Sequence, residues 1–218
     1  MSEITLVRHG QANTGARDEI SYDKLSPLGH QQAQWLGDHL RSCKDHYARI
    51  YCGTLTRHEE TARAMGFDAG QLIRDPRLNE MEYFTLAQAM EAQHGLAIPQ
   101  EREGFVAHLP QVFAAWEADR IAAPYESWRD FESRTKAALS EIAEGDGPAL
   151  VVTSGGLISM VMRHCLGLDT AATARIALAI MNTSLHRLHN IGGHYAPVLF
   201  NAVPHLEEPD RQYARTHL

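Results

Sequence analysis

The stretch "ITLVRHGQ", Ile4 to Gln11, decides the fold, because it joins an apolar run directly to a polar turn. The residues from Ile4 to Val7 are apolar or β-branched, which is typical of a short buried strand. Arg8, His9 and Gly10 follow at once. Ligands of open α/β sheets bind beyond the carboxyl ends of the strands. The polar residues that follow this strand are therefore candidates for a functional site.

The same strand-then-helix pattern returns twice. "ARIYCG", ending at Gly53, is predicted to be a strand, and "TLTRHEETARAMG" behind it a helix. "LVVTSGGLIS", from Leu150, is predicted to be a strand that runs into a glycine break and another helix. Before the second strand, Ser26 is a candidate N-cap with Pro27 at the first helical position. Alternating strands and helices predict a parallel sheet with right-handed crossovers.

The middle and the end of the chain differ in character. From about residue 85 to 143 the sequence predicts two or three helices, packed on one face of the sheet or forming a cap over its carboxyl edge. Gly192 and Gly193 predict a hairpin between the last two strands. The tail, about 205–218, is expected to be partly ordered at best. We expect a single domain over residues 1–218.

Composition excludes several classes of protein. Hydrophobic residues make up 44% and charged residues 22% of the 218 residues, which is ordinary globular usage rather than that of a disordered or fibrous chain. The net charge of -7, without a dense Lys/Arg stripe, argues against nucleic-acid and anionic-membrane partners. No apolar run is long enough to span a membrane, and "MSEITLVRHG" has no features of an export signal. The expected compartment is the cytoplasm.

Neither cysteines nor histidines indicate a metal or a disulfide framework. Cys43, Cys52 and Cys165 are odd in number and widely spaced, as in reduced intracellular proteins. The 13 histidines include no HExxH or HxH pattern, so we expect no metal and no cofactor. His30 and His58 are predicted to lie on helix surfaces.

The polar groups that follow the strands suit phosphoryl transfer. An unprotonated imidazole nitrogen of His9 can attack phosphorus if a backbone carbonyl fixes the other ring nitrogen. The guanidinium groups of Arg8 and Arg57 can bind the phosphoryl oxygens bidentately. The leaving alkoxide needs a proton, which a carboxyl can give; Glu80 is our candidate, with Glu82 second.

Several of these segments carry a family resemblance. "LVRHGQA", "YDKLSPLGHQQAQWLG", "YCGTLTRHEETA", "LNE" and the late strand-Gly-Gly element resemble, in this order, the histidine phosphatase superfamily, in its phosphoglycerate-mutase-like branch. The resemblance implies a three-layer α/β/α sandwich around a mostly parallel sheet, with a helical cap. It also implies His9 as nucleophile, Arg8 and Arg57 as the phosphate clamp, and Glu80 as proton donor.

The late strand departs from the pattern of that family. In most members it ends in Ser-His-Gly, and the histidine is a second imidazole beside the phosphoryl group. Ser154 stands at that position here, as in a subgroup with Thr-Ser-Gly-Gly. Ser154 can donate a hydrogen bond to phosphate, and Gly155 allows backbone N–H groups to approach the anion. An alternative of equal weight is that the Ser154 side chain only caps the next helix.

Three functions follow from the resemblance and the departure. The first is a metal-independent phosphatase that hydrolyses a small phosphomonoester through a phosphohistidine on His9. The second is a catalytically weak phosphate-binding or regulatory protein, and a phosphoglycerate mutase is the least favoured. Asn13, Thr14 and Arg17 are further candidates for substrate contacts. A homodimer is a possible assembly.

Overall fold

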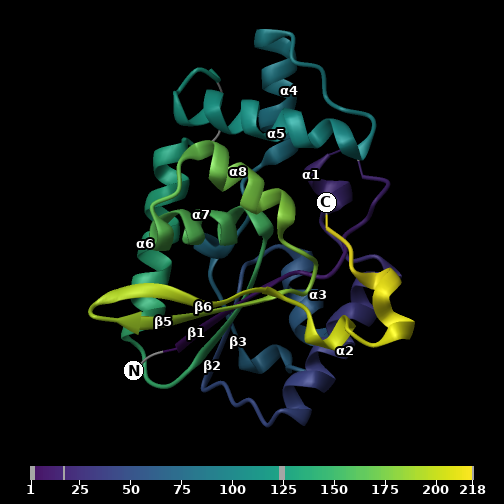
Figure 1. Ribbon diagram of the computed structural model, residues 1–218, viewed down its shortest axis with the longest axis vertical. Helices are drawn as coiled ribbons and strands as arrows, with labels where there is room; N and C mark the ends of the chain where they lie inside the picture. The colour runs from purple at the N-terminus through teal and green to yellow at the C-terminus, as the bar shows by residue number, and fades with distance from the viewer. Residues whose placement is uncertain (1–2, 17, 123–125, 218) are drawn as a thin grey trace.

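A six-stranded sheet forms the centre of the computed structural model, which describes residues 3–16, 18–122 and 126–217 (Figure 1). The strand order is β3-β2-β4-β1-β5-β6. The strands β1 to β4 run parallel to one another, and β5 runs antiparallel to both β1 and β6. The predicted mostly parallel sheet is confirmed. The strands are β1 (Glu3–Arg8), β2 (Arg49–Cys52), β3 (Leu72–Arg74), β4 (Ala149–Thr153), β5 (Leu185–Ile191) and β6 (His194–Ala202).

Helices cover both faces of this sheet, as the resemblance implied. The helices are α1 (Glu19–Tyr22), α2 (Pro27–Ser42), α3 (Thr56–Ala64), α4 (Tyr83–His94), α5 (Arg102–Glu117), α6 (Trp128–Glu144), α7 (Gly155–Leu166) and α8 (Thr170–Ala179). Short 3-10 helices are Ala69–Gln71, Pro76–Leu78, Pro204–Leu206 and Pro209–Ala214. In Figure 1, α2 and α3 lie on one side of the strands and α6 and α7 on the other.

Alternation along β1 explains the layers, because successive side chains of a strand point to opposite faces. Ile4 and Leu6 join the larger apolar cluster, which contains residues of α4 to α8. Val7 joins a second cluster with Leu36 of α2 and Ala62 of α3. The centre of the sheet, at β1 and β4, is therefore buried on both faces, whereas β6 is partly exposed. The edge at the carboxyl ends of β1 and β4 is the place left for a ligand.

The helices between residues 83 and 144 take both arrangements that the sequence left open. The helix α6 packs along β1 and α7, on one face of the sheet. The helices α4 and α5 pack on each other, and α5 also packs on α8, at the top of Figure 1. Residues of α4 and α5 therefore form the roof over the carboxyl edge of the sheet.

Two local predictions are confirmed, and two features differ from expectation. Ser26 caps α2 by accepting a hydrogen bond from the Gly29 N–H at 3.0 Å. Gly192 and Gly193 make the β5–β6 turn with φ angles of 63° and 87°. The strand β3 was not predicted, since three residues are too short to show a period. The expectation of a poorly ordered tail is wrong: Gln32 Nε2 donates to the Ala214 carbonyl at 2.6 Å and anchors it.

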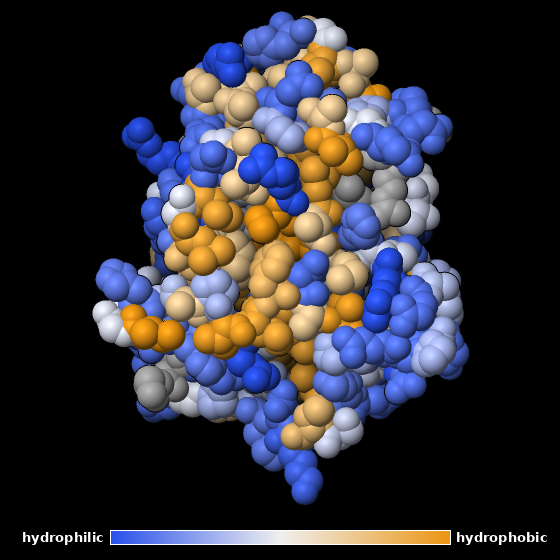
Figure 2. Space-filling view, in the orientation of Figure 1, coloured by the Kyte–Doolittle hydropathy of each residue, from blue (hydrophilic) through white to orange (hydrophobic). Residues whose placement is uncertain are grey.

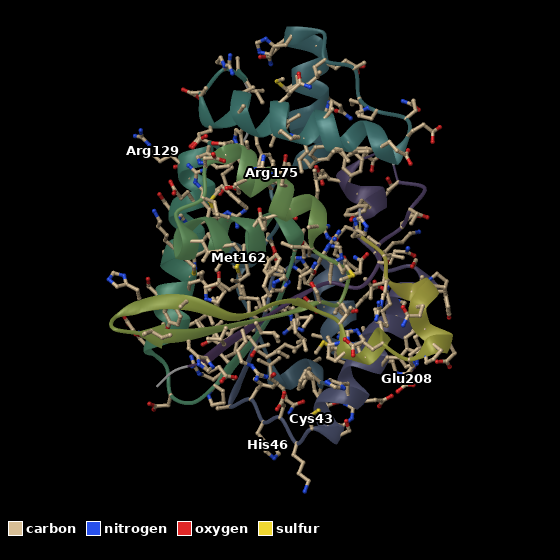
Figure 3. All side chains as sticks on the ribbon, in the orientation of Figure 1. Cys43, His46, Arg129, Met162, Arg175 and Glu208 are labelled. Carbon is tan, nitrogen blue, oxygen red and sulfur yellow. The ribbon has the colours of Figure 1, made fainter. Side chains whose placement is uncertain are left out.

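All three cysteines are free, and Cys43 lies at the end of the molecule opposite α4 and α5 (Figure 3). No cluster of three or more His, Cys, Asp or Glu suited to a metal ion occurs among the described residues. Within the same part of the chain, no helix has both the length and the apolar character to cross a bilayer.

Candidate active site

The carboxyl ends of β1 and β4 bring the predicted site residues together. Arg8 pairs with Thr153 in the parallel register, so the residues that follow, His9 and Ser154, are neighbours. A cavity of about 350 Å³ opens at this point, roofed by residues of α4 and α5. Five of the predicted site residues line it: Arg8, His9, Arg57, Glu80 and Gly155. Ser154 is fully buried beside them.

His9 is held as a neutral base. Its Nδ1 lies 2.7 Å from the Gly10 carbonyl oxygen. Because a carbonyl can only accept, Nδ1 carries the hydrogen and Nε2 keeps its lone pair. Burial first, and then the positive charges of Arg57 and Arg8, hold the pKa of His9 well below its ordinary value of 6.5. The free Nε2 is therefore available as a nucleophile at neutral pH.

Two buried guanidinium groups flank His9. Arg57 is 2% exposed; its Nη1 donates to Asp23 Oδ1 at 3.1 Å, and its Cζ lies 5.1 Å from the centre of the Tyr22 ring. Arg8 donates through Nη1 to the Ile180 carbonyl. The Nε atoms of both arginines are buried and have no partner among the described residues. Unpaired buried donors are costly, so these two groups suit a bound anion.

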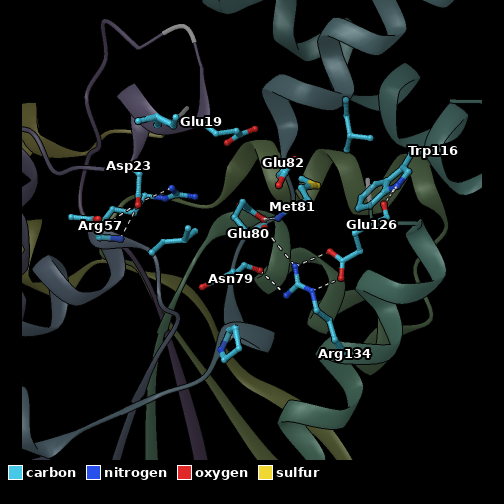
Figure 4. A pocket seen from close by; sticks show the side chains of 15 residues that line it. Glu19, Asp23, Arg57, Asn79, Glu80, Met81, Glu82, Trp116, Glu126 and Arg134 are labelled. Carbon is cyan, nitrogen blue, oxygen red and sulfur yellow. Dashed lines mark hydrogen bonds and ion pairs between the residues drawn. The ribbon is translucent and has the colours of Figure 1, made fainter. Parts of the chain in front are cut away.

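Glu80 is placed by the helix α7 and by an arginine of α6. Its Oε2 accepts the Gly156 N–H at 2.9 Å. A Cβ at Gly156 would lie 2.4 Å from Glu80 Oε1, so a larger residue here would force the carboxylate to shift. From the other side, Arg134 donates to the Asn79 carbonyl at 2.8 Å and pairs with Glu126 (Figure 4). Glu82, the second candidate, lies outside this cavity, in the neighbouring pocket of Figure 4.

Ser154 bonds to a histidine and does not cap a helix. Its Oγ lies 2.6 Å from His58 Nε2, and its side chain makes no capping bond to α7. The surface position predicted for His58 is wrong, because the first turn of α3 faces the sheet and the ring is 0% exposed. The ring centre of His58 lies 5.8 Å from that of His9. Burial and then Arg57 hold the pKa of His58 well below 6.5. The other predicted surface histidine, His30, is exposed.

The sequence also matches a family model over most of its length. The description of that model is "Histidine phosphatase superfamily (branch 1)", and it matches residues 4–203. The chain belongs to the histidine phosphatase superfamily. A comparison with curated proteins finds no match.

Solved histidine phosphatase structures share this fold. A mutant phosphoserine phosphatase from Entamoeba histolytica, in complex with phosphoserine, is 17% identical, with a TM-score of 0.69 over 94% of this chain and 100% of its own. A phosphoglycerate mutase from Bacillus anthracis is 23% identical, with a TM-score of 0.68 over 94% of both chains. A mycobacterial glucosyl-3-phosphoglycerate phosphatase is 22% identical, with a TM-score of 0.64 over 92% of this chain and 98% of its own. At these identities the likeness establishes the fold.

Two carboxylates of this histidine phosphatase were missed from the sequence. Glu19 lines the cavity, and its Oε1 accepts the Phe84 N–H at 2.8 Å. Burial raises the pKa of Glu19, and the nearby Glu80 adds to the rise. Asp23 accepts the Thr56 N–H at 2.9 Å and pairs with Arg57. Both lie in a polar stretch where many carboxylates occur, and no spacing distinguishes them.

The walls of the cavity are mainly apolar away from the arginines. The aromatic and aliphatic side chains along it are Tyr22, Met81, Tyr83, Phe84, Phe105, Leu109 and Leu178. Among the described lining residues, Arg8 and Arg57 are the only Lys or Arg side chains. Asn13 and Thr14 line the cavity as well, whereas Arg17 lies outside the described residues. The part of the histidine phosphatase pocket at Arg8 and Arg57 therefore suits an anion. The rest of the pocket has mainly apolar walls and the carboxyl groups of Glu19 and Glu80.

Proposed function

We propose that this histidine phosphatase hydrolyses a small phosphomonoester through a phosphohistidine on His9. The observation that carries the proposal is the His9 ring, fixed at Nδ1 by the Gly10 carbonyl and flanked by two buried arginines with unpaired Nε atoms. A neutral imidazole with a free Nε2 is the nucleophile that such a reaction needs. The arginines are placed to bind the phosphoryl oxygens as negative charge develops on them.

The reaction has two steps. In the first, His9 Nε2 forms a bond to phosphorus, the ester P–O bond breaks, and Glu80 gives its proton to the leaving oxygen. In the second, a water attacks phosphorus, Glu80 takes the proton of that water, and the P–N bond breaks to release inorganic phosphate. Arg8 and Arg57 supply the positive charge that a metal ion would otherwise provide. We therefore propose a metal-independent reaction.

The apolar walls support hydrolysis over mutase activity. A phosphoglycerate carries a carboxylate beside the phosphoryl group, and a buried carboxylate needs a cation or several donors. The described lining residues offer two cations, Arg8 and Arg57, both needed by the phosphoryl group. Glu19 and Glu80 repel a second anion, and Gln11, Asn13, Thr14 and Asn182 add only neutral polar groups. We propose esters whose leaving group carries no second negative charge as the preferred substrates.

One observation favours a second candidate, a phosphate-binding or regulatory protein without turnover. Ser154 stands where most of the family carries an imidazole, and a hydroxyl supplies no positive charge. Such a protein would use Arg8 and Arg57 to hold a phosphorylated ligand and would not form the covalent intermediate. Hydrolysis and binding therefore have to be measured on the same preparation.

The test is a phosphomonoester panel at neutral pH, in the presence of a chelator, with wild type and His9→Ala. We expect release of phosphate by the wild type, with aryl and uncharged alkyl esters preferred over 3-phosphoglycerate, and loss of at least about 10³-fold in His9→Ala. Equal rates in the two proteins would refute the mechanism. Tight binding of inorganic phosphate without hydrolysis of any ester would identify the second candidate.

A further inference from the structure

A second imidazole lies beside the nucleophile, and the two-step reaction gives it no task. His58 comes from the first turn of α3, which also carries Arg57. Its ring is fully buried, with its centre 5.8 Å from that of His9. Burying an imidazole costs free energy unless its polar atoms are bonded. The position of His58 therefore needs a physical reason.

The hydrogen bond of His58 has a definite direction. Its Nε2 lies 2.6 Å from Ser154 Oγ, whereas its Nδ1 is buried without a partner among the described residues. A Cβ added at Gly53 would lie 2.2 Å from Nδ1, so a C–H of Gly53 points at that nitrogen. A hydrogen on Nδ1 would collide with that C–H and would be a buried donor without a partner, which favours the lone pair on Nδ1 and the hydrogen on Nε2. His58 therefore donates to Ser154.

This direction leaves the Ser154 hydroxyl hydrogen free to donate. No other hydrogen bond of the Ser154 side chain occurs among the described residues, and it does not cap α7. Ser154 follows Thr153, whose carbonyl accepts the His9 N–H at 2.8 Å. Its other neighbour, Gly155, lines the cavity, where a Cβ would lie 3.5 Å from Arg8 Nε. Ser154 does not line the cavity itself, but it adjoins the wall that Gly155 forms, against which a phosphoryl oxygen held by Arg8 would lie.

We propose that His58 is a positioning residue of the phosphoryl site, which donates its Nε2 hydrogen to Ser154 Oγ so that the Ser154 hydroxyl donates to a phosphoryl oxygen. The inference rests on the proposed phosphatase function. Both hydrogens stay on their atoms throughout, and each bond polarises the next as charge develops on the oxygen.

A double-mutant cycle tests this relay, the two hydrogen bonds that run from His58 through Ser154 to the phosphoryl group. Ser154→Ala and His58→Ala are each expected to lower kcat roughly 10²-fold with KM little changed, as for the loss of one oxyanion donor. Because both act through one bond to the phosphoryl group, the double variant is expected to be no slower than the slower single variant. His58→Gln, which keeps an N–H donor, is expected to recover part of the rate.

The matched control is His205→Ala. His205 is also buried, with its Nε2 2.8 Å from the Thr183 hydroxyl and its Nδ1 without a partner among the described residues, and it does not line the cavity. Its loss is expected to lower the thermal midpoint about as much as His58→Ala does, with kcat within about twofold of wild type. A merely structural role for His58 would give the two variants the same kcat.

Two outcomes of the cycle overturn the relay. They are an unchanged kcat in His58→Ala, and single losses that multiply in the double variant. In both cases the wild type still hydrolyses esters, so the proposed function survives.

If the wild type hydrolyses no ester, that function fails, and calorimetric binding of inorganic phosphate decides the relay. About tenfold weaker binding in both Ser154→Ala and His58→Ala supports it, and unchanged binding in either overturns it. If His58→Ala does not fold, His58→Leu, which fills the same space without a hydrogen-bond donor, takes its place in these tests.

Discussion

At the residue scale, two side chains of the cavity are candidates for the proton donor, Glu80 and Glu19. Glu80 is fixed by the Gly156 N–H, while Glu19 lies on the short helix α1 and bonds to the Phe84 N–H. We expect Glu80→Gln to lower kcat about 10²-fold for an alkyl phosphate and under tenfold for an aryl phosphate, whose better leaving group needs less protonation. Steady-state rates on the two esters measure this.

Glu19→Gln is the matched variant, because it replaces another carboxyl of the same cavity by an amide. We expect it to change the rates on both esters by a similar and smaller factor. A selective loss on the alkyl ester in Glu19→Gln, with Glu80→Gln unaffected, would assign the donor to Glu19.

At this scale the sequence predicted residues that follow strands and missed those placed by packing. Arg8 and His9 extend β1, and Arg57 opens the helix after β2, so their shared edge follows from the parallel sheet. His58 differs, because its contact with Ser154 depends on how α3 sits against β4. The surface position expected for it was wrong for that reason.

At the element scale, the start of α7 must approach the loop that carries Glu80. A Cβ at Gly156 would lie 2.5 Å from Met81 Cε and 2.4 Å from Glu80 Oε1. Gly156→Ala is therefore expected to displace Glu80 and to lower kcat for an alkyl phosphate at least about tenfold. The control is Gly70→Ala, where an added Cβ meets nothing within 4 Å. Full activity in Gly156→Ala would show that the position of Glu80 is less critical than we propose.

Elements were predictable where their own residues carry the signal. Ser26 and Pro27 mark the start of α2, and the two glycines mark the last hairpin. The strand β3 and the tail lack such signals, because contacts with distant residues hold them. Ile50 of β2 pairs with Leu72 of β3, and Gln32 of α2 binds the tail. Local sequence patterns do not contain these long-range contacts.

At the scale of the whole molecule, buried imidazoles predict sensitivity to acid. Burial lowers the pKa of His186 and of His205 to about 3. In the unfolded chain both rings take up a proton near pH 6.5, so stability is retained above that pH and lost as the pH falls toward 3. Each ring is expected to lower the free energy of unfolding by about 1.4 kcal/mol at pH 5.5.

Chemical denaturation at pH 7.5 and pH 5.5 measures this loss. In His205→Gln the loss of unfolding free energy between pH 7.5 and pH 5.5 is expected to be about 1.4 kcal/mol smaller, which is the contribution of one ring. An unfolding free energy that is the same at both pH values would contradict the account of these buried rings.

The surface of the molecule bears on the oligomeric state, which stays a prediction. Figure 2 shows hydrophobic side chains gathered over the β5–β6 hairpin and the helices beside it. Ile191, Val198 and Phe200 are the exposed large hydrophobic residues of these two strands. The homodimer and the cytoplasmic location stay predictions from the sequence, and light scattering of the purified protein measures the first.

The proposed mechanism depends above all on a covalent phosphoryl group on His9. The most direct measurement is rapid quenching into alkali during turnover of a phosphomonoester, followed by peptide mass analysis, since phosphohistidine survives alkaline conditions. We predict a single phosphoryl group on the peptide that contains His9, formed at least as fast as turnover and absent from His9→Ala. Turnover without any phosphorylated peptide, or a label that persists in His9→Ala, would rule out His9 as the nucleophile.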